Sequence, residues 1–297
     1  MLSHYRQQFS AEGVSFAMRE NIMMIDVENE FASALITTHG GCVLSFTPKN
    51  GQDLLWVSPT ALYNGQKPVR GGVPVCWPWF GANTQYASAP AHGFVRNAVW
   101  HLDHVAKLDS GVTEIVLTFD SNAETLAIWP HSFHLALKIE VGKKLTMSLI
   151  TTNLNDYDIQ ITEAFHTYFN VADARNLVIR GLEGSTHLDK LSNAPAERQM
   201  ETLTLKPPMD SVYLNQTGDI AIEDAGNQRR IMIEKLHADS AVVWNPGPET
   251  VKGFADLPDD LWPEFVCVEA GNIFDNAVVI ASGDKHTMSM MLSSQNA

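Results

Sequence analysis

The sequence predicts an all-β protein, a large antiparallel β-sandwich with a few short helices. Short apolar runs of strand length recur along the chain, and several carry hydrophobic residues at every second position. Long stretches with a 3.6-residue hydrophobic period are missing, so an alternating βαβ architecture would lack its helices. We expect one domain over residues 1–297, because β-sandwiches of this length often remain undivided.

The clearest strands lie in 135–152, where apolar residues alternate with polar or small ones on both sides of Gly142-Lys143-Lys144. This pattern predicts a β-hairpin with one solvated face. A weak helix is predicted around 195–202. Further strands are predicted at 113–119, 159–165, 265–270 and 277–281, with a last hairpin turning through 282–285 into 287–292.

The charge balance excludes several classes of partner. The chain has 34 acidic and 20 basic residues and a formal net charge of −14, which opposes a broad interface with a phosphate backbone. We therefore expect no nucleic acid and no anionic membrane as a partner. An anionic small molecule would require a local cationic pocket against the field of the whole protein.

Cysteine usage and the first residues indicate the compartment. Cys42, Cys76 and Cys267 are an odd set without CxxC spacing, so no disulfide framework is predicted and a reducing compartment fits best. The first twenty residues hold no apolar core behind a basic start, and no uncharged apolar run reaches 18 residues. We expect a cytoplasmic monomer without a membrane span.

Two loops rich in Gly and Pro, 64–92 and 244–263, are long for connectors, and such loops on a β scaffold commonly carry function. Within the first, 70–81 reads RGGVPVCWPWFG. Its prolines and glycines predict a stiff loop that holds Arg70 over a concave surface, with Trp77 and Trp79 as flat faces for a pyranose. The alternative is a structural corner whose arginine pairs with a core carboxylate.

A second cationic segment, 91–97, contains His92 and Arg96 around a glycine. Arg70 and Arg96 together would supply the bidentate donors and the charge that a phosphate dianion needs. The alternative is that Arg96 is a surface or ion-paired arginine.

Two residues are candidates for acid and base chemistry. His166 follows 161–165, where strand alternation puts Glu163 on the opposite face, so a partner carboxylate must come from elsewhere. Glu269 ends the apolar strand 265–270, where burial is costly unless the carboxyl group is hydrogen-bonded or functional, and a raised pKa suits a general base. The alternative is a solvated glutamate at a strand end.

Metal and cofactor sites are not predicted. The pairs His101/His104 and His131/His134 are three residues apart, so on strands their rings point to opposite faces and cannot share an ion. HExxH, G-x-S-x-G, a P-loop and a dinucleotide-binding G-x-G-x-x-G after a strand are absent from the sequence.

Six motifs in order, RGGVPVCWPWFG, AHGFVRN, FHTYFN, MDSVYLN, WNPG and FVCVEA, resemble the glucose-6-phosphate 1-epimerase (D-hexose-6-phosphate mutarotase) family. The resemblance implies a galactose mutarotase-like β-sandwich that interconverts the anomers of a hexose 6-phosphate without a metal or cofactor. It implies the following roles: His166 as catalytic acid, Glu269 as catalytic base, Arg70 and Arg96 as substrate-binding arginines, Asp210 as a ligand of sugar hydroxyls and His92 as a further sugar contact.

Two positions depart from the family pattern. Some relatives have a ligand-contacting glutamine where this chain has Ala91, and relatives commonly have arginine where it has Ser211. Three alternatives stay open at this point: a free-hexose mutarotase with the same His/Glu pair, a glycosidase using Glu269 and Asp210 as its two carboxylates, and a non-catalytic carbohydrate-binding protein.

Overall fold

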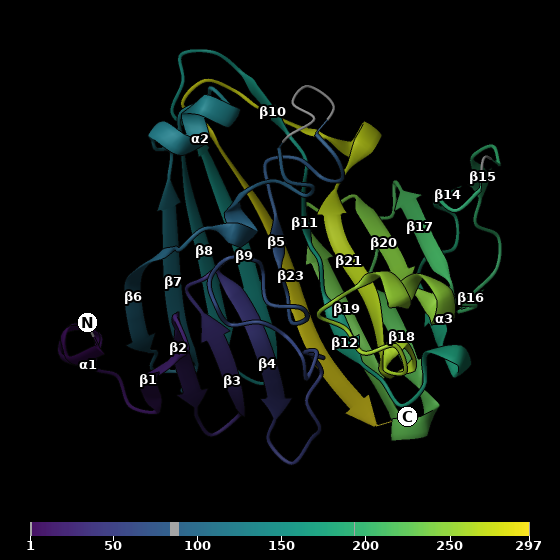
Figure 1. The fold of residues 1–297 in the computed structure, drawn as a ribbon, viewed down its shortest axis with the longest axis horizontal. Helices are drawn as coiled ribbons and strands as arrows, with labels where there is room; N and C mark the ends of the chain where they lie inside the picture. Colours follow the sequence, from purple (N-terminus) through teal and green to yellow (C-terminus); the bar gives the residue numbers. More distant parts are fainter. Residues whose placement is uncertain (1, 84–88, 193, 297) are drawn as a thin grey trace.

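Strands dominate the chain and its helices are short (Figure 1), which confirms the predicted class. The computed structural model describes residues 2–83, 89–192 and 194–296. Within these ranges no helix is both long and apolar enough to cross a membrane. The α-helices are α1 (Leu2–Gln8), α2 (Ala123–Ile128) and α3 (Gly247–Thr250), and 3₁₀ turns occupy Val95–Asn97, Ala174–Asn176, Ala225–Asn227, Val251–Gly253, Trp262–Glu264 and Phe274–Asn276.

The largest sheet has nine antiparallel strands and forms one layer of the sandwich. The hairpin predicted at 135–152 is its β8–β9 pair, in which Val141 lies opposite Leu145 and alternate residues of β8 are fully buried. In spatial order the strands are β16 (Leu203–Thr204), β13 (Val178–Arg180), β18 (Ile220–Asp224), β19 (Arg229–Leu236), β23 (Lys285–Asn296), β9 (Leu145–Asn153), β8 (Phe133–Val141), β7 (Thr113–Asp120) and β6 (His101–Lys107).

A second sheet has eight antiparallel strands and carries the polar residues of interest. The predicted strand at 265–270 is its central strand β21, which pairs with β20, β11 and β12. The strands are β15 (Glu197–Arg198), β14 (Thr186–Asp189), β17 (Met209–Leu214), β20 (Ser240–Asn245), β21 (Phe265–Asn272), β11 (Glu163–Phe165) and β5 (Val75–Cys76), with β12 (Tyr168–Asn170) also on β21.

Two smaller sheets complete the molecule. A four-stranded sheet contains β1 (Val14–Arg19), β2 (Ile22–Glu28), β3 (Ala32–Thr37) and β4 (Cys42–Pro48), and a two-stranded ribbon contains β10 (Ile159–Ile161) and β22 (Val278–Ile280). The predicted strand at 159–165 is thus divided between β10 and β11. An isolated bridge from Val43 to Val73 joins the four-stranded sheet to the loop before β5.

The three larger sheets share one buried apolar core. Ile36 of β3, Leu137 of β8 and Val268 of β21 belong to the same cluster and are fully buried. A buried hydrogen bond of 3.1 Å from Trp77 Nε1 to Thr151 Oγ1 crosses from the loop after β5 to β9. Burial of this much apolar surface is the main force that holds the two layers together.

The predicted last hairpin is wrong, although its turn forms. Asp284 N donates to the carbonyl oxygen of Ala281 at 3.0 Å, but β22 then pairs with β10 and β23 pairs with β9. The side chain of Asn153, at the end of β9, donates to the carbonyl oxygens of Ile280 and Ala281 and satisfies backbone groups where the chain changes partner. The strands that flank the turn therefore enter different sheets.

The helix predicted around 195–202 is also wrong. Glu197–Arg198 forms β15, where Arg198 pairs with Thr186, and Gln199 N donates to the carbonyl oxygen of Ser185 at 2.9 Å. Pairing with the edge of the sheet overrides a weak local helix propensity, as tertiary context commonly does.

Candidate active site

A hollow of about 300 Å³ opens over β17, β20, β21 and β12 of the eight-stranded sheet. Both long loops predicted to carry function contribute to its wall, although residues 84–88 of the first lie outside the described residues. All six predicted site residues line this one hollow. The lining residues are Arg70, Phe80, His92, Arg96, His166, Tyr168, Lys190, Asp210, Val242, Trp244, Phe254 and Glu269.

The register of one ladder brings His166 and Glu269 together. Phe165 pairs with Ala270 before the break between β11 and β12, and Tyr168 pairs with Cys267 after it. His166 and Glu269 therefore occupy opposed positions, where Cβ atoms lie roughly 4.5–5.5 Å apart on the same face of an antiparallel pair. His166 Nε2 lies 3.3 Å from Glu269 Oε1.

His166 is fixed by its backbone and by a stacked neighbour. Its backbone N–H donates to the carbonyl oxygen of Pro74 at 2.9 Å, and its ring stacks on Tyr168 at 5.0 Å between centroids with 17° between planes. Burial, followed by the nearby charges of His92 and Arg96, lowers the pKa of His166 well below its ordinary value. The imidazole is therefore held in one orientation and favours its neutral form.

Glu269 is a buried carboxyl group, with 2% of its side chain exposed. Its Oε2 is buried and has no hydrogen-bond partner among the described residues. Burial, and then the charge of Asp210, raises the pKa of Glu269 well above its ordinary value. A buried oxygen without a hydrogen-bond partner is energetically costly unless a ligand binds to it. This environment therefore favours a functional role for Glu269 over that of a solvated residue at a strand end.

Arg70 lines the hollow while pairing with a carboxylate. Its Nε lies 3.2 Å from Asp256 Oδ1, and its Nη1 donates to the hydroxyl of Tyr168 at 3.2 Å. The guanidinium also lies over the ring of Phe254 at 4.9 Å. Both interpretations of Arg70 thus hold, because it is ion-paired and also faces the hollow.

The segment with His92 and Arg96 is held against Gly81 and Trp77. His92 has a positive φ of 61°, and its N–H donates to the carbonyl oxygen of Gly81 at 2.7 Å. Arg96 lies in the 3₁₀ turn Val95–Asn97, and its Nη2 donates to the carbonyl oxygen of Ala91 at 2.9 Å. Burial, with the charges of Arg96 and Lys190, lowers the pKa of His92 to about 3, so His92 is neutral.

Asp210 enters the hollow from β17 and is accompanied by a lysine that the sequence analysis missed. Lys190 Nζ lies 3.7 Å from Asp210 Oδ2, and Lys190 N donates to the carbonyl oxygen of Asp210 at 2.8 Å. Burial raises the pKa of Asp210 despite the opposing charge of Lys190. No motif marks Lys190, because its place depends only on pairing beyond the end of β14.

The predicted sugar-stacking role of Trp77 and Trp79 is wrong for Trp77 and is not supported for Trp79. Trp77 is fully buried in the core, and Trp79 Nε1 donates to the carbonyl oxygen of Pro90 at 3.0 Å. Neither lines the hollow. The aromatic rings that line the hollow belong instead to residues that the sequence analysis did not single out: Phe80, Tyr168, Trp244 and Phe254.

Glu163 lies apart from His166, as strand alternation predicts. Its carboxyl oxygen Oε1 lies 2.8 Å from His286 Nε2 and accepts a hydrogen bond of 3.0 Å from Asn272. Ser211, one of the two positions that depart from the family pattern, also faces away from the hollow. Its hydroxyl lies 3.0 Å from Nε2 of His187, and neighbouring residues of a strand, here Asp210 and Ser211, point to opposite faces. Ala91 contributes its carbonyl oxygen to Arg96.

The three cysteines do not line the hollow. Cys42, Cys76 and Cys267 are buried free thiols, and burial raises the pKa of Cys76 to about 12. Within residues 2–83, 89–192 and 194–296, no group of three or more His, Cys, Asp or Glu side chains is placed to hold a metal ion.

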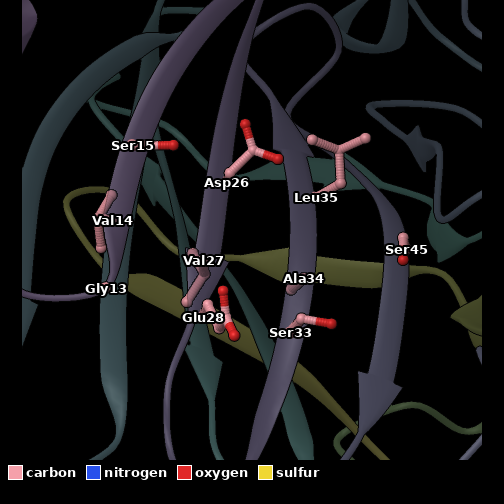
Figure 2. Close-up of a pocket in the computed structure, with 10 residues that line it drawn as sticks. All are labelled: Gly13, Val14, Ser15, Asp26, Val27, Glu28, Ser33, Ala34, Leu35 and Ser45. Carbon is pink, nitrogen blue, oxygen red and sulfur yellow. The ribbon is translucent and has the colours of Figure 1, made fainter.

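A second hollow, of about 440 Å³, lies on the face of the four-stranded sheet. Figure 2 shows Ser15, Asp26 and Ser33 standing on this face along neighbouring strands. Its charged side chains are Asp26 and Glu28 alone, and both are exposed. The first hollow is lined by a buried carboxyl group, a histidine and three cations, and the second hollow has no such set.

The chain is similar to known proteins in sequence and in fold. A model of the aldose 1-epimerase family matches residues 23–293. Proteins of Salmonella typhimurium and Escherichia coli, each described as "Putative glucose-6-phosphate 1-epimerase", are 35% identical over 253 residues, covering 84% of this chain and 83% of theirs. The crystal structure of a "putative mutarotase" from Salmonella typhimurium matches with a TM-score of 0.88 and 29% identity over 96% of this chain and 94% of that chain.

Proposed function

Because the chain belongs to the aldose 1-epimerase family, we propose that it interconverts the α and β anomers of a hexose 6-phosphate, with His166 as acid and Glu269 as base. The observation that carries this proposal is the 3.3 Å approach of the imidazole to the carboxyl group inside a hollow of sugar size. A general acid and a general base must both reach the reacting atoms in one pose, and these two groups share one wall.

The reaction needs one proton removed and one added. Glu269 takes the proton of the C1 hydroxyl while His166 gives a proton to the ring oxygen, so the C1–O5 bond breaks and an aldehyde forms. Rotation about C1–C2 and reclosure with the proton transfers reversed produce the other anomer. Each group contributes roughly 10²–10⁴-fold in catalysis of this kind.

The two groups must carry a single proton between them. Burial raises the pKa of Glu269 and lowers that of His166, so a neutral carboxyl group beside a neutral imidazole is favoured at rest. The charge of Arg96 opposes the rise in the pKa of Glu269 and favours the carboxylate. Transfer of the shared proton to His166 produces the base and the acid together, without a proton from solvent.

The phosphate is assigned to the cationic wall. Arg70, Arg96 and Lys190 line the hollow of a chain whose net charge is −14, which is the local exception that an anionic substrate requires. The descriptions of the two bacterial relatives support glucose 6-phosphate as the substrate. We assign Asp210 and His92 to sugar hydroxyls, because each offers an acceptor or donor beside the catalytic pair.

Anomer exchange measured by NMR tests the proposal. The protein should accelerate exchange between the anomers of glucose 6-phosphate above the spontaneous rate, and more strongly than exchange of glucose or galactose. Acceleration of galactose alone would replace the phosphorylated substrate by a free hexose. No acceleration of any of the three sugars would remove the proposed activity.

A further inference from the structure

The three cations of the hollow differ in how firmly each is held. Arg70 is fixed by Asp256 and by the Tyr168 hydroxyl, both at 3.2 Å, and lies over Phe254. Its charge is largely compensated by a carboxylate whose side chain is only 15% exposed. Arg70 therefore offers an incoming dianion less uncompensated charge than a cation without a carboxylate partner.

Arg96 has the opposite character. Its Nη2 donates to the carbonyl oxygen of Ala91, and its Nε is buried without a partner among the described residues. Within the described part of the chain no carboxylate forms an ion pair with it. Arg96 is therefore a fixed cation whose charge is available to a ligand.

Lys190 combines an anchored backbone with a movable charge. Its N–H donates to the carbonyl oxygen of Asp210 at 2.8 Å, which fixes its Cα beside the hollow. Its ammonium group, however, stands 3.7 Å from Asp210 Oδ2, beyond ordinary hydrogen-bond distance, and 37% of the side chain is exposed. Ion pairs this loose and exposed contribute little, so the pair is easily broken.

Lys190 and Arg96 both line the hollow. Both cations lower the pKa of His92, and both oppose the rise in the pKa of Glu269. A dianionic phosphate bound between them would meet one fixed guanidinium and one mobile ammonium group. These are complementary contributions, because arginine supplies a fixed fork and lysine an adaptable point charge.

We propose that Lys190 determines specificity for the phosphorylated sugar by exchanging partners, leaving Asp210 to bind the phosphate together with Arg96. The exchange frees the carboxylate of Asp210 to accept a hydrogen bond from a sugar hydroxyl. A free hexose offers no anion, so Lys190 stays beside Asp210 and adds nothing to the binding of that sugar. This inference rests on the proposed function. It assigns the preference for a hexose 6-phosphate over a free hexose to the ion pair of Lys190 with Asp210.

Kinetics of Lys190→Met and Lys190→Arg on glucose 6-phosphate and on glucose test the exchange. We expect Lys190→Met to raise KM for glucose 6-phosphate by about 10- to 100-fold, the worth of one charge-assisted contact, with kcat changed less than about threefold. For glucose, kcat/KM should change much less, because a free hexose has no phosphate for Lys190 to bind. In Lys190→Arg, KM for glucose 6-phosphate should return most of the way to the wild-type value. The matched control is Lys252→Met, which removes an exposed ion pair with Glu249 outside the hollow.

Titration with inorganic phosphate, followed by ³¹P NMR, separates this inference from the proposed reaction. The Kd of the wild-type protein for phosphate should rise at least about tenfold in Lys190→Met and remain near the wild-type value in Lys190→Arg. An unchanged Kd, or equal losses on both sugars, would overturn the role of Lys190. A wild-type protein that binds phosphate through Lys190 but exchanges no anomers would overturn the reaction instead.

Discussion

His166 and Glu269 are opposed residues of one antiparallel ladder, since the pairings of Phe165 with Ala270 and of Tyr168 with Cys267 continue the same register on both sides of them. The strands on either side of His166, together with the bond from its N–H to the carbonyl oxygen of Pro74, therefore set their separation. The bond of His166 to Pro74 continues the register in which Phe165 of β11 pairs with Val75 of β5. Loss of either side chain should consequently affect chemistry far more than folding.

Glu269→Gln and His166→Ala should each lower kcat for anomer exchange by roughly 10²–10⁴-fold, because each removes one proton-transfer group. Thermal unfolding should stay cooperative in both variants. His101→Ala, at an exposed position of β6, is the control and should retain full activity. Wild-type exchange rates in a folded Glu269→Gln protein would eliminate the assigned base.

Asp210→Asn should move the alkaline limb of the pH profile. Asp210 raises the pKa of Glu269, and removal of its negative charge weakens the hold of the catalytic pair on its shared proton. The fall of kcat/KM on the alkaline side should therefore begin at lower pH than in the wild type, whatever happens to the maximal rate. Asp26→Asn, on the four-stranded sheet, should leave the limb in place, and an upward shift in Asp210→Asn would contradict the electrostatic link.

Two tryptophans should separate stability from binding. Trp77→Ala removes a fully buried side chain and its bond to Thr151, so the free energy of unfolding should fall by about 3–5 kcal/mol in urea denaturation. Trp244→Ala removes an aromatic wall of the hollow and should raise KM roughly 3- to 10-fold, the worth of an aromatic contact. A large KM effect of Trp77→Ala in a stable protein would restore the stacking role predicted from sequence.

Much of the fold was predictable because hydrophobic alternation reports strands directly. The β8–β9 hairpin follows from alternating residues around Gly142, and its observed bounds differ little from those predicted. Strand partners were less predictable, since pairing depends on contacts distant in sequence. A turn formed at 281–284, one residue before the predicted 282–285, yet the strands on either side of it joined different sheets.

Within the site, the residues carried by motifs were predicted and the unmarked ones were not. His166, Glu269, Arg70 and Asp210 lie in recognisable segments, and all face the hollow. Lys190 has no such segment and reaches the hollow only because β14 pairs with β17. Composition could not distinguish a buried tryptophan from one that faces a ligand, because both occur in the same Pro-rich context.

Gly93→Ala should damage both stability and activity. Gly93 has a positive φ of 73°, and an added Cβ would clash with the carbonyl oxygen of Trp77. The backbone that carries His92 and Arg96 would have to move, so we expect a loss of about 1–3 kcal/mol in the free energy of unfolding and a lower kcat/KM. Gly283→Ala shares the positive φ but has open space around it, so it isolates the effect of the clash.

Glu163→Gln should make stability depend differently on pH. Burial alone would lower the pKa of His286, but its hydrogen bond to Glu163, with the charges of Glu163 and Asp239, raises it on balance. A raised pKa in the folded state stabilises the protein fully below the unfolded pKa of about 6.5, and this contribution disappears as pH rises through the folded-state value. The free energy of unfolding of the wild type should therefore exceed that of Glu163→Gln by about 1.5–3 kcal/mol at low pH. At high pH this difference should be smaller.

Urea unfolding at about pH 5.5 and pH 8.5 measures this margin on both sides of the histidine titration. The matched control is Glu234→Gln, which breaks an ion pair with Lys144 that involves no histidine. The control should cost the same free energy at both values of pH. A margin for Glu163→Gln that is equally constant would show that its carboxyl group stabilises the fold through Asn272 alone, without the protonated imidazole of His286.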